Sequence, residues 1–245
     1  MLPVLEEDEE KLHWVDHLEE LRRRLFVILG GLAAASVVSF FFSDAIFHFL
    51  IQPIRAFQEK LYFMAPYEAF LVKLKVSFFA GIILSAPVTF IQLWRFVAPG
   101  LYEKEKRQIA IATSWTVFCF FFGIIFAFFF VAPFALQFFL GFQTPDLRPL
   151  ISVKEYISFF IGFLLAFGIA FVFPVFLLVL VRFGILQCSE LTRQRRLAIV
   201  IIFIAAAILT PTTDVITQTL LAIPLIALFE ISLLMAKRIE RKRRT

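Results

Sequence analysis

The sequence predicts an all-α polytopic membrane protein with six transmembrane helices and both termini in the cytoplasm. Hydrophobic residues make up 61% of its 245 residues and its mean hydropathy is +0.89, far above what a water-soluble domain of this size needs for its core. Six long uncharged stretches alternate with charged segments. Basic residues concentrate on every second charged segment, as expected when those segments stay in the cytoplasm.

Each uncharged stretch can hold one membrane-spanning helix, which needs roughly 20 mainly apolar residues. In chain order the stretches are 25–43, 76–94, 108–145, 156–181, 197–213 and 215–236, the last interrupted by Glu230. Only the third is long enough for two spans. We expect one span there, from about Ile109 to Val131, which ends near Pro133 because proline interrupts a helix, with an amphipathic external segment after it.

The fifth and sixth spans are expected to be short. The fifth stretch has 17 residues, which as a helix measure about 25 Å, against a hydrocarbon core of about 30 Å. A span of that length must thin the bilayer or be shielded by neighbouring helices. The Phe-rich run 118–130 of the third span is expected to face lipid as apolar bulk.

The whole chain, 1–245, is expected to form one integral membrane domain with three flanking segments. In 1–24, leucine and valine recur at spacings of three and four, which predicts a cytoplasmic interfacial helix leading into the first span. Residues 44–75 are too long for a hairpin turn and are broken by prolines, so short helices should form an external cap. A helix should start within 66–70 and run on into the second span, and 237–245 should be a basic cytoplasmic tail.

The distribution of Lys and Arg assigns the cytoplasmic side. With the N-terminus inside, cytoplasmic segments carry 18 of the 24 basic residues and external segments carry six. The net charge of +5 therefore reflects membrane topology, and the tail KRIERKRRT suits contact with anionic lipid, not nucleic acid. We expect a multi-pass protein of the cell (inner) membrane.

Several classes of site find no support in the sequence. Cys119 lies in the third span and Cys188 in a cytoplasmic loop, so no disulfide is implied. The three histidines show no metal-ligand spacing, and no glycine-rich phosphate loop followed by lysine occurs. RRRLFVILGGLAAAS resembles a cleavable export signal, but its apolar run continues to Phe42, which favours a full-length span. We expect no cofactor, no metal and no enzymatic activity.

Two charged stretches on the cytoplasmic side could carry binding chemistry. In HLEELRRRL, 17–25, Glu19 and Glu20 each precede an arginine by four residues, the spacing of helical ion pairs, which alone indicates only a topology anchor. In FVAPGLYEKEKR, 96–107, Glu103 and Glu105 lie among bases beside an aromatic turn. Two acidic sites on one face could receive a cation, and arginine fits best because its planar guanidinium pairs with a carboxylate.

Polar residues inside the predicted spans are candidate sites because they are costly in a membrane. Gln92 lies near the cytoplasmic end of the second span. Glu230 lies in the sixth span, where it must be protonated or satisfied by a neighbouring helix, or else carry a function. Thr210, Asp214 and Gln218 mark the external end of the fifth and sixth spans.

Three separated motifs, in this order, resemble the TatC family of the twin-arginine, or Sec-independent, protein translocase. They are HLEELRRRL, then SAPVTFIQLWRFVAPGLYEKEKR at 85–107, then LTPTTDVITQTLLAIPLIALFEIS at 209–232. The resemblance covers nearly the whole chain. It implies a receptor and core component of the machinery that exports folded proteins bearing a twin-arginine signal peptide, driven by the proton motive force.

The resemblance also implies roles for particular residues. Residues matching Glu20 and Glu105 form the patch that engages the signal arginines in the family, and the aromatic matching Phe96 lies beside it. Glu103, Arg22 and Gln92 are assigned to the same region. The Glu20–Arg24 pair would keep the empty site from carrying a bare negative charge, while Arg22, Arg23 and Arg24 mainly hold the span in place.

Further implications concern partners. The region of Thr210, Asp214 and Gln218 is where family members contact single-span TatA/TatB-type subunits, so homo- and hetero-oligomers are expected. The chain departs from the family at FGIAFVFPV, 167–175: Val172 stands where most members have a carboxylate or amide. A mechanism that needs an ionisable group there must use Glu230 or do without it.

One alternative of another class stays open at this point. A secondary transporter of a small cation or solute would place its polar site at mid-membrane, whereas a receptor would gather it on the cytoplasmic face. Glu20, Gln92, Glu103 and Glu105 cluster at the cytoplasmic side against a single deeper carboxylate, which favours the receptor.

Overall fold

The computed structural model describes residues 4–57, 60–97, 106–144, 149–182, 192–209 and 215–244. Its elements are α1 (Val4–Phe41), α2 (Ser43–Leu50), α3 (Gln52–Arg55), β1 (Leu61–Tyr62), α4 (Glu68–Val97), α5 (Lys106–Phe126), the π-helical turn η2 (Ala127–Val131), α6 (Ala132–Leu140), β2 (Ile151–Ser152), α7 (Val153–Arg182), α9 (Arg195–Leu209) and α10 (Val215–Arg244). The fold is mostly helical.

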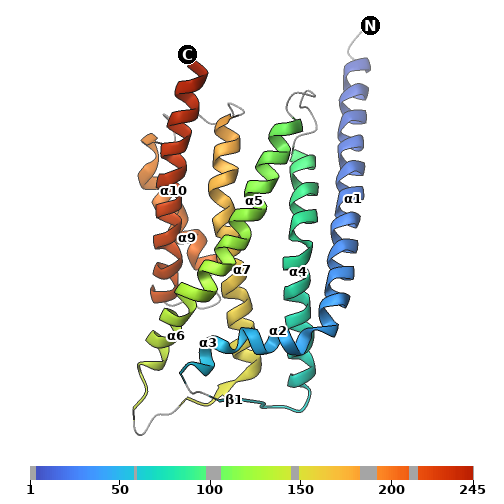
Figure 1. Cartoon of the computed structure of the whole chain (residues 1–245). Coiled ribbons are helices and arrows are strands. Elements are labelled where there is room, and N and C mark those ends of the chain that lie inside the picture. The colour runs from blue at the N-terminus through green and yellow to red at the C-terminus, as the bar shows by residue number, and fades with distance from the viewer. Residues whose placement is uncertain are drawn as a thin grey trace.

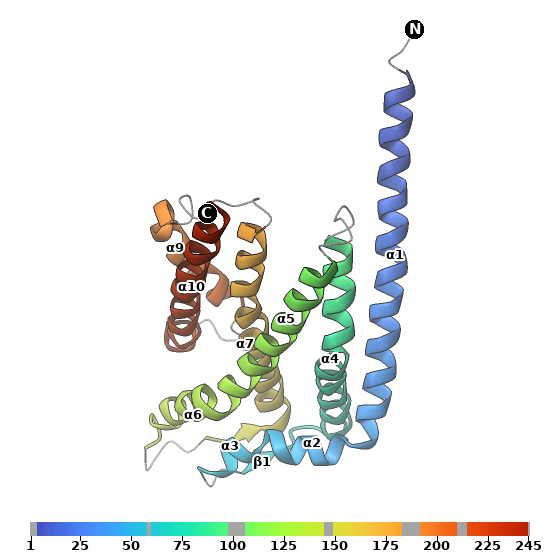
Figure 2. The ribbon, with the colours of Figure 1, turned by 45° about the horizontal axis from the view of Figure 1, so that its top comes forward.

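The long helices run roughly along one direction and define two ends of the molecule (Figure 1). α1 begins and α10 ends at one end, whereas α2, α3 and β1 lie across the opposite end. We call the latter the cap end. Turning the molecule shows α1 standing at one edge of the bundle, with α9 and α10 at the other edge (Figure 2).

Among the residues that the structure describes, five helical stretches are long and apolar enough to cross a membrane: His17–Phe41, Glu68–Phe96, Ala110–Leu140, Val153–Val181 and Val215–Arg238. α9 has 15 residues and measures about 22 Å, so the expected fifth helix is short. The expectation of a short sixth helix is wrong, because α10 has 30 residues and continues from its apolar part directly into the basic tail. Lys and Arg are good helix formers, so a basic tail does not end the helix.

The sequence predicted that the third span ends near Pro133, and this prediction is wrong. α5 passes through η2 into α6, and helical structure continues to Leu140. Pro133 lies in the first turn of α6, directly after the π-turn, where its missing N–H interrupts little hydrogen bonding. The wider π-turn absorbs the break that the proline would otherwise make.

The N-terminal segment and the first span form a single helix, α1, of 38 residues. Residues 44–75 contain α2, α3, β1 and the start of α4, which begins at Glu68 as the sequence indicated. The Glu68 carboxylate accepts the backbone N–H of Met64 at 2.9 Å. β1 pairs in parallel with β2, Leu61 with Ile151, and so ties this segment to the chain entering α7.

The core lies around α7, where Phe160, Phe163 and Phe167 are fully buried. α5 approaches α7 closely, because a Cβ on Gly123 would lie 2.6 Å from the Phe167 carbonyl oxygen. The Phe-rich run of the third span divides between two environments. Phe118, Phe122, Phe129 and Phe130 are exposed, as expected for lipid-facing bulk, whereas Phe120 and Phe128 are buried against other helices.

Candidate functional site

The candidate site lies where the N-terminal half of α1 runs beside the C-terminal half of α4. The two helices pack closely at Gly81, where an added Cβ would lie 2.9 Å from the Cα of Ser36. This approach fixes the position of α1 against α4. Side chains on α1 can therefore bond to partners on α4 that are about 70 residues away in the chain.

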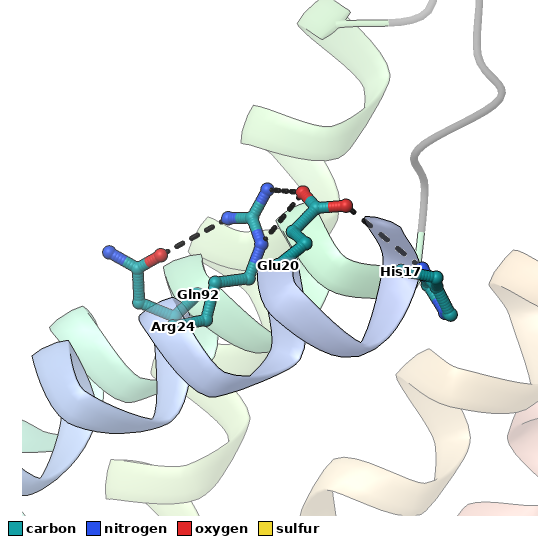
Figure 3. A network of polar contacts seen from close by, with 4 residues as sticks. All are labelled: His17, Glu20, Arg24 and Gln92. Atoms are coloured by element: carbon teal, nitrogen blue, oxygen red, sulfur yellow. Dashed lines mark hydrogen bonds and ion pairs between the residues drawn. The ribbon is translucent and has the colours of Figure 1, made fainter. Parts of the chain in front are cut away.

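A polar network of four residues, His17, Glu20, Arg24 and Gln92, connects α1 to α4, as Figure 3 shows. The Arg24 guanidinium donates from Nε to Glu20 Oε1 at 3.0 Å, and its Nη2 forms an ion pair with the same oxygen. Its Nη1 donates to Gln92 Oε1 on α4 at 3.1 Å. Gln92, predicted as an intramembrane polar residue, thus holds the arginine that neutralises Glu20.

The second Glu20 oxygen faces His17, whose Nδ1 lies 4.0 Å from Oε2. The imidazole in turn stacks on the Phe96 ring of α4, with centroids 4.5 Å apart and planes inclined by 12°. His17 therefore lies between the Phe96 ring and the Glu20 carboxylate and contacts both. Glu20, Gln92 and Phe96 are thus brought to one place.

The site is partly shielded but open to a ligand. The side chain of Arg24 is 15% exposed and that of Glu20 is 28% exposed. A hollow of about 670 Å³ adjoins them, and it is lined by Glu19, Glu20, Arg22, Arg23 and Phe26. Such an arrangement presents a carboxylate that already binds one guanidinium at the wall of an accessible hollow.

Arg22, assigned to the same region by the sequence, lines the hollow and pairs with Glu19 and not with Glu20 among the described residues. Its guanidinium lies 3.8 Å from Glu19, and both side chains are largely exposed, so the pair contributes little. Within the described residues Glu19 pairs with this arginine and not with Arg23, four residues on. Glu103 and Glu105 lie outside the described residues.

The region expected to dock partner helices is described in part. The amide of Gln218 donates to the backbone carbonyl of Phe203 at 2.9 Å and joins α10 to α9. Thr210 and Asp214 lie outside the described residues. Near the other end of the same helix pair, Glu230 forms an ion pair with Arg195 at the start of α9. This carboxylate is therefore satisfied by a neighbouring helix.

The sequence predicts the pair of Glu20 with Arg24 but does not place His17 in the site, because a histidine without metal-ligand spacing carries no signal of its own. The signal that could have found His17 is its spacing, since positions 17, 20 and 24 follow one another by three and four residues and share a helix face. Among the residues that the structure describes, no group of three or more His, Cys, Asp or Glu side chains could hold a metal ion.

Comparison with known proteins gives a consistent result. Residues 16–224 match the family described as Sec-independent protein translocase protein (TatC). A protein of that name from Magnetococcus marinus is 43% identical over 238 residues, 96% of this chain and 88% of its own length. One from Aquifex aeolicus is 39% identical over 233 residues, 94% of this chain and 96% of its length.

Solved structures agree with the sequence comparison. A crystal structure described as the twin arginine translocase receptor TatC superposes with a TM-score of 0.81 at 38% identity. The match covers 91% of this chain and 99% of that one. A second structure of the same receptor, in DDM, gives the same TM-score and covers 90% of this chain.

Proposed function

Because the chain belongs to the TatC family of Sec-independent protein translocase proteins, we propose that it binds twin-arginine signal peptides through Glu20. As a member of this family it is a membrane protein of protein translocation and a receptor component of the Tat machinery, not an enzyme. Because the chain belongs to this family, we no longer consider the alternative that it is a secondary transporter.

The observation that carries the proposal is the ion pair between Glu20 and Arg24. A guanidinium already occupies the carboxylate with two donors, so the site has the geometry that recognises an arginine. A signal arginine would displace Arg24 from Glu20, and Arg24 would keep its hydrogen bond to Gln92. The exchange leaves Arg24 with only the neutral Gln92 amide, so its displacement costs free energy that the contacts of the signal arginine must offset.

Phe96 and His17 would provide the second element of recognition. Their stacked rings stand beside Glu20, and a guanidinium lies well on an aromatic face. Glu105, with Glu103 near it in the chain, would receive the other arginine of the pair. An ammonium group cannot form the same paired hydrogen bonds, so the site should prefer arginine to lysine.

The proposed topology places this site in the cytoplasm. We take α9 as a sixth, short span, which puts both termini on one side, and the basic residues assign that side to the cytoplasm. The common position of the start of α1 and the end of α10 supports this arrangement (Figure 1). The cap end would then face away from the cytoplasm, with the protein in the cell (inner) membrane.

Single-span partner proteins of the TatA/TatB type would dock at α9 and the adjoining part of α10. α9 is too short to span the hydrocarbon alone, and Gln218 lies in the first turns of α10, which follows it in the chain. Thr210 and Asp214 belong to the proposed docking region by their position in the sequence. Among the described residues the Gln218 amide donates one N–H to the Phe203 carbonyl, which leaves its second N–H and its carbonyl oxygen for a partner helix. One such interhelical hydrogen bond contributes about 1 kcal/mol.

The proposal is tested by measuring the affinity of a fluorescent twin-arginine signal peptide for the full-length protein in nanodiscs. We expect Glu20→Gln to weaken binding by tenfold or more, because the charge-assisted pair is lost. Glu19→Gln is the matched control and should lose far less affinity, since Glu19 lines the same hollow but is largely exposed and pairs only with Arg22 among the described residues. Equal affinity of both variants would remove Glu20 from the site.

A further inference from the structure

We propose that an apolar hollow at the cap end binds one acyl chain of an anionic phospholipid. The hollow has a volume of about 430 Å³ and lies among α1, α2, α4, α5 with η2, and α7. This volume falls within the range of ordinary ligand pockets, about 300–1,000 Å³. It lies away from Glu20, at the other end of α1, and belongs to no site described above.

The lining is suited to hydrocarbon. Every lining residue is apolar apart from Ser39, and the Ser39 hydroxyl donates to the Ala35 carbonyl of its own helix at 2.7 Å. The walls therefore present no free hydrogen-bonding side chain to an occupant. An apolar cavity of this kind does not hold water, so in a membrane the adjacent lipid chains are the material that fills it.

α2 forms the floor of the hollow and has the character of an interfacial helix. Ile46, Phe49 and Leu50 line the hollow, whereas Asp44 and His48 lie on the polar side of the same helix. A helix of this kind lies at the boundary between acyl chains and headgroups. The hollow thus begins at the depth where the acyl chains of the cap-side leaflet begin.

Basic groups at this boundary favour an anionic headgroup. Arg55 on α3 is exposed, and its Nη2 lies 3.5 Å from His48 Nδ1, an imidazole that cannot neutralise its charge. Lys73 on α4 reaches Asp44, with Nζ 2.7 Å from Oδ1. Two cations against one carboxylate leave a positive excess where a lipid phosphate would lie.

The dimensions favour an acyl chain over a helix. One turn of helix with its side chains is about 10 Å across and 5.4 Å tall, so it fills about 420 Å³. The hollow would hold barely one such turn, and the rest of a helical segment would stay outside. An extended hydrocarbon chain has no side chains and can enter along its length.

The test uses nitroxide-labelled phospholipids with the full-length protein in liposomes. Electron paramagnetic resonance should show a motionally restricted acyl-chain component, with phosphatidylglycerol favoured about fivefold over phosphatidylcholine. Leu84→Trp should remove the preference for phosphatidylglycerol and leave the component of the lipids that surround the helices, because Leu84 lines the hollow and indole would occupy it. Leu93→Trp is the matched control: Leu93 is also exposed on α4 but does not line the hollow.

A second variant separates the chain from the headgroup. Arg55→Gln should abolish the preference for phosphatidylglycerol and leave the restricted component for both lipids. An equal preference for phosphatidylglycerol in the wild type, Leu84→Trp and Leu93→Trp would overturn the proposal. So would a wild type without this preference in which Leu84→Trp instead weakens signal-peptide binding, since the hollow would then belong to the peptide.

Discussion

At the scale of single residues, the proposed recognition depends on the guanidinium that Glu20 already binds. The spacing of Glu20 and Arg24 predicted their ion pair from the sequence alone. The contacts to Gln92 and Phe96 could not be predicted in this way, because they depend on how α1 is placed against α4. His17 was overlooked for the same reason, since its importance comes from a ring on another helix.

Removing the internal competitor should strengthen binding. We expect Arg24→Gln to raise the affinity for a twin-arginine peptide by about threefold, because the peptide no longer displaces a partner from a partly exposed pair. Arg23→Gln provides the control, since Arg23 lines the hollow without bonding to Glu20. Titration of labelled peptide into both variants checks this, and weaker binding to Arg24→Gln would show that Arg24 supports the site.

The stacked rings of His17 and Phe96 should contribute to peptide binding through their aromatic faces. We expect His17→Ala to weaken peptide binding by about threefold, the loss of a modest aromatic contact, and His17→Phe to restore it. The thermal midpoint of each variant is measured beside its affinity. If His17→Phe binds as poorly as His17→Ala, the imidazole acts through its nitrogen on Glu20 and not through stacking.

At the scale of elements, close helix contacts keep the site together. Gly81 allows α4 to approach Ser36 of α1, whereas an added Cβ on Gly30 would meet nothing within 4 Å. We expect Gly81→Ala to destabilise the protein by about 1–3 kcal/mol and to weaken peptide binding. Gly30→Ala should change neither the thermal midpoint nor the affinity. Equal effects would mean that the crossing does not depend on Gly81.

The short helix α9 is joined to α10 by the ion pair of Arg195 with Glu230. Arg195→Gln leaves the carboxylate without its partner and should lower stability by about 1–2 kcal/mol, a value discounted for the partial exposure of both groups. The double variant Arg195→Gln, Glu230→Gln should recover much of that loss. Thermal unfolding in detergent measures it, and a double variant less stable than the single one contradicts the pairing.

The sequence predicted elements best where one signal acted alone. The length of the apolar stretches predicted the long helices and the short α9. The segment 66–70, which begins with a proline, predicted the start of α4. The prediction failed where signals conflicted. Proline at 133 argued for a break, but the π-turn η2 preceded it, and basic residues at the end of α10 were compatible with both a loop and a helix.

At the scale of the whole molecule, both termini should lie on the cytoplasmic side with the cap end opposite. A single cysteine at the exposed Gln52 position, in a Cys119→Ser, Cys188→Ser background, should react with a membrane-impermeant maleimide added outside intact cells. A cysteine at the exposed Arg238 should react only after the membrane is opened. Reaction of both in intact cells would contradict an even number of spans.

The central claim is that Glu20 recognises an arginine of the signal peptide. The most direct test measures the affinities of an Arg-Arg peptide and its Lys-Lys counterpart for the wild type and for Glu20→Gln, in nanodiscs at one salt concentration. We expect the wild type to prefer Arg-Arg by tenfold or more and Glu20→Gln to lose most of this preference, because the paired guanidinium hydrogen bonds are lost. The same preference in both proteins would contradict it.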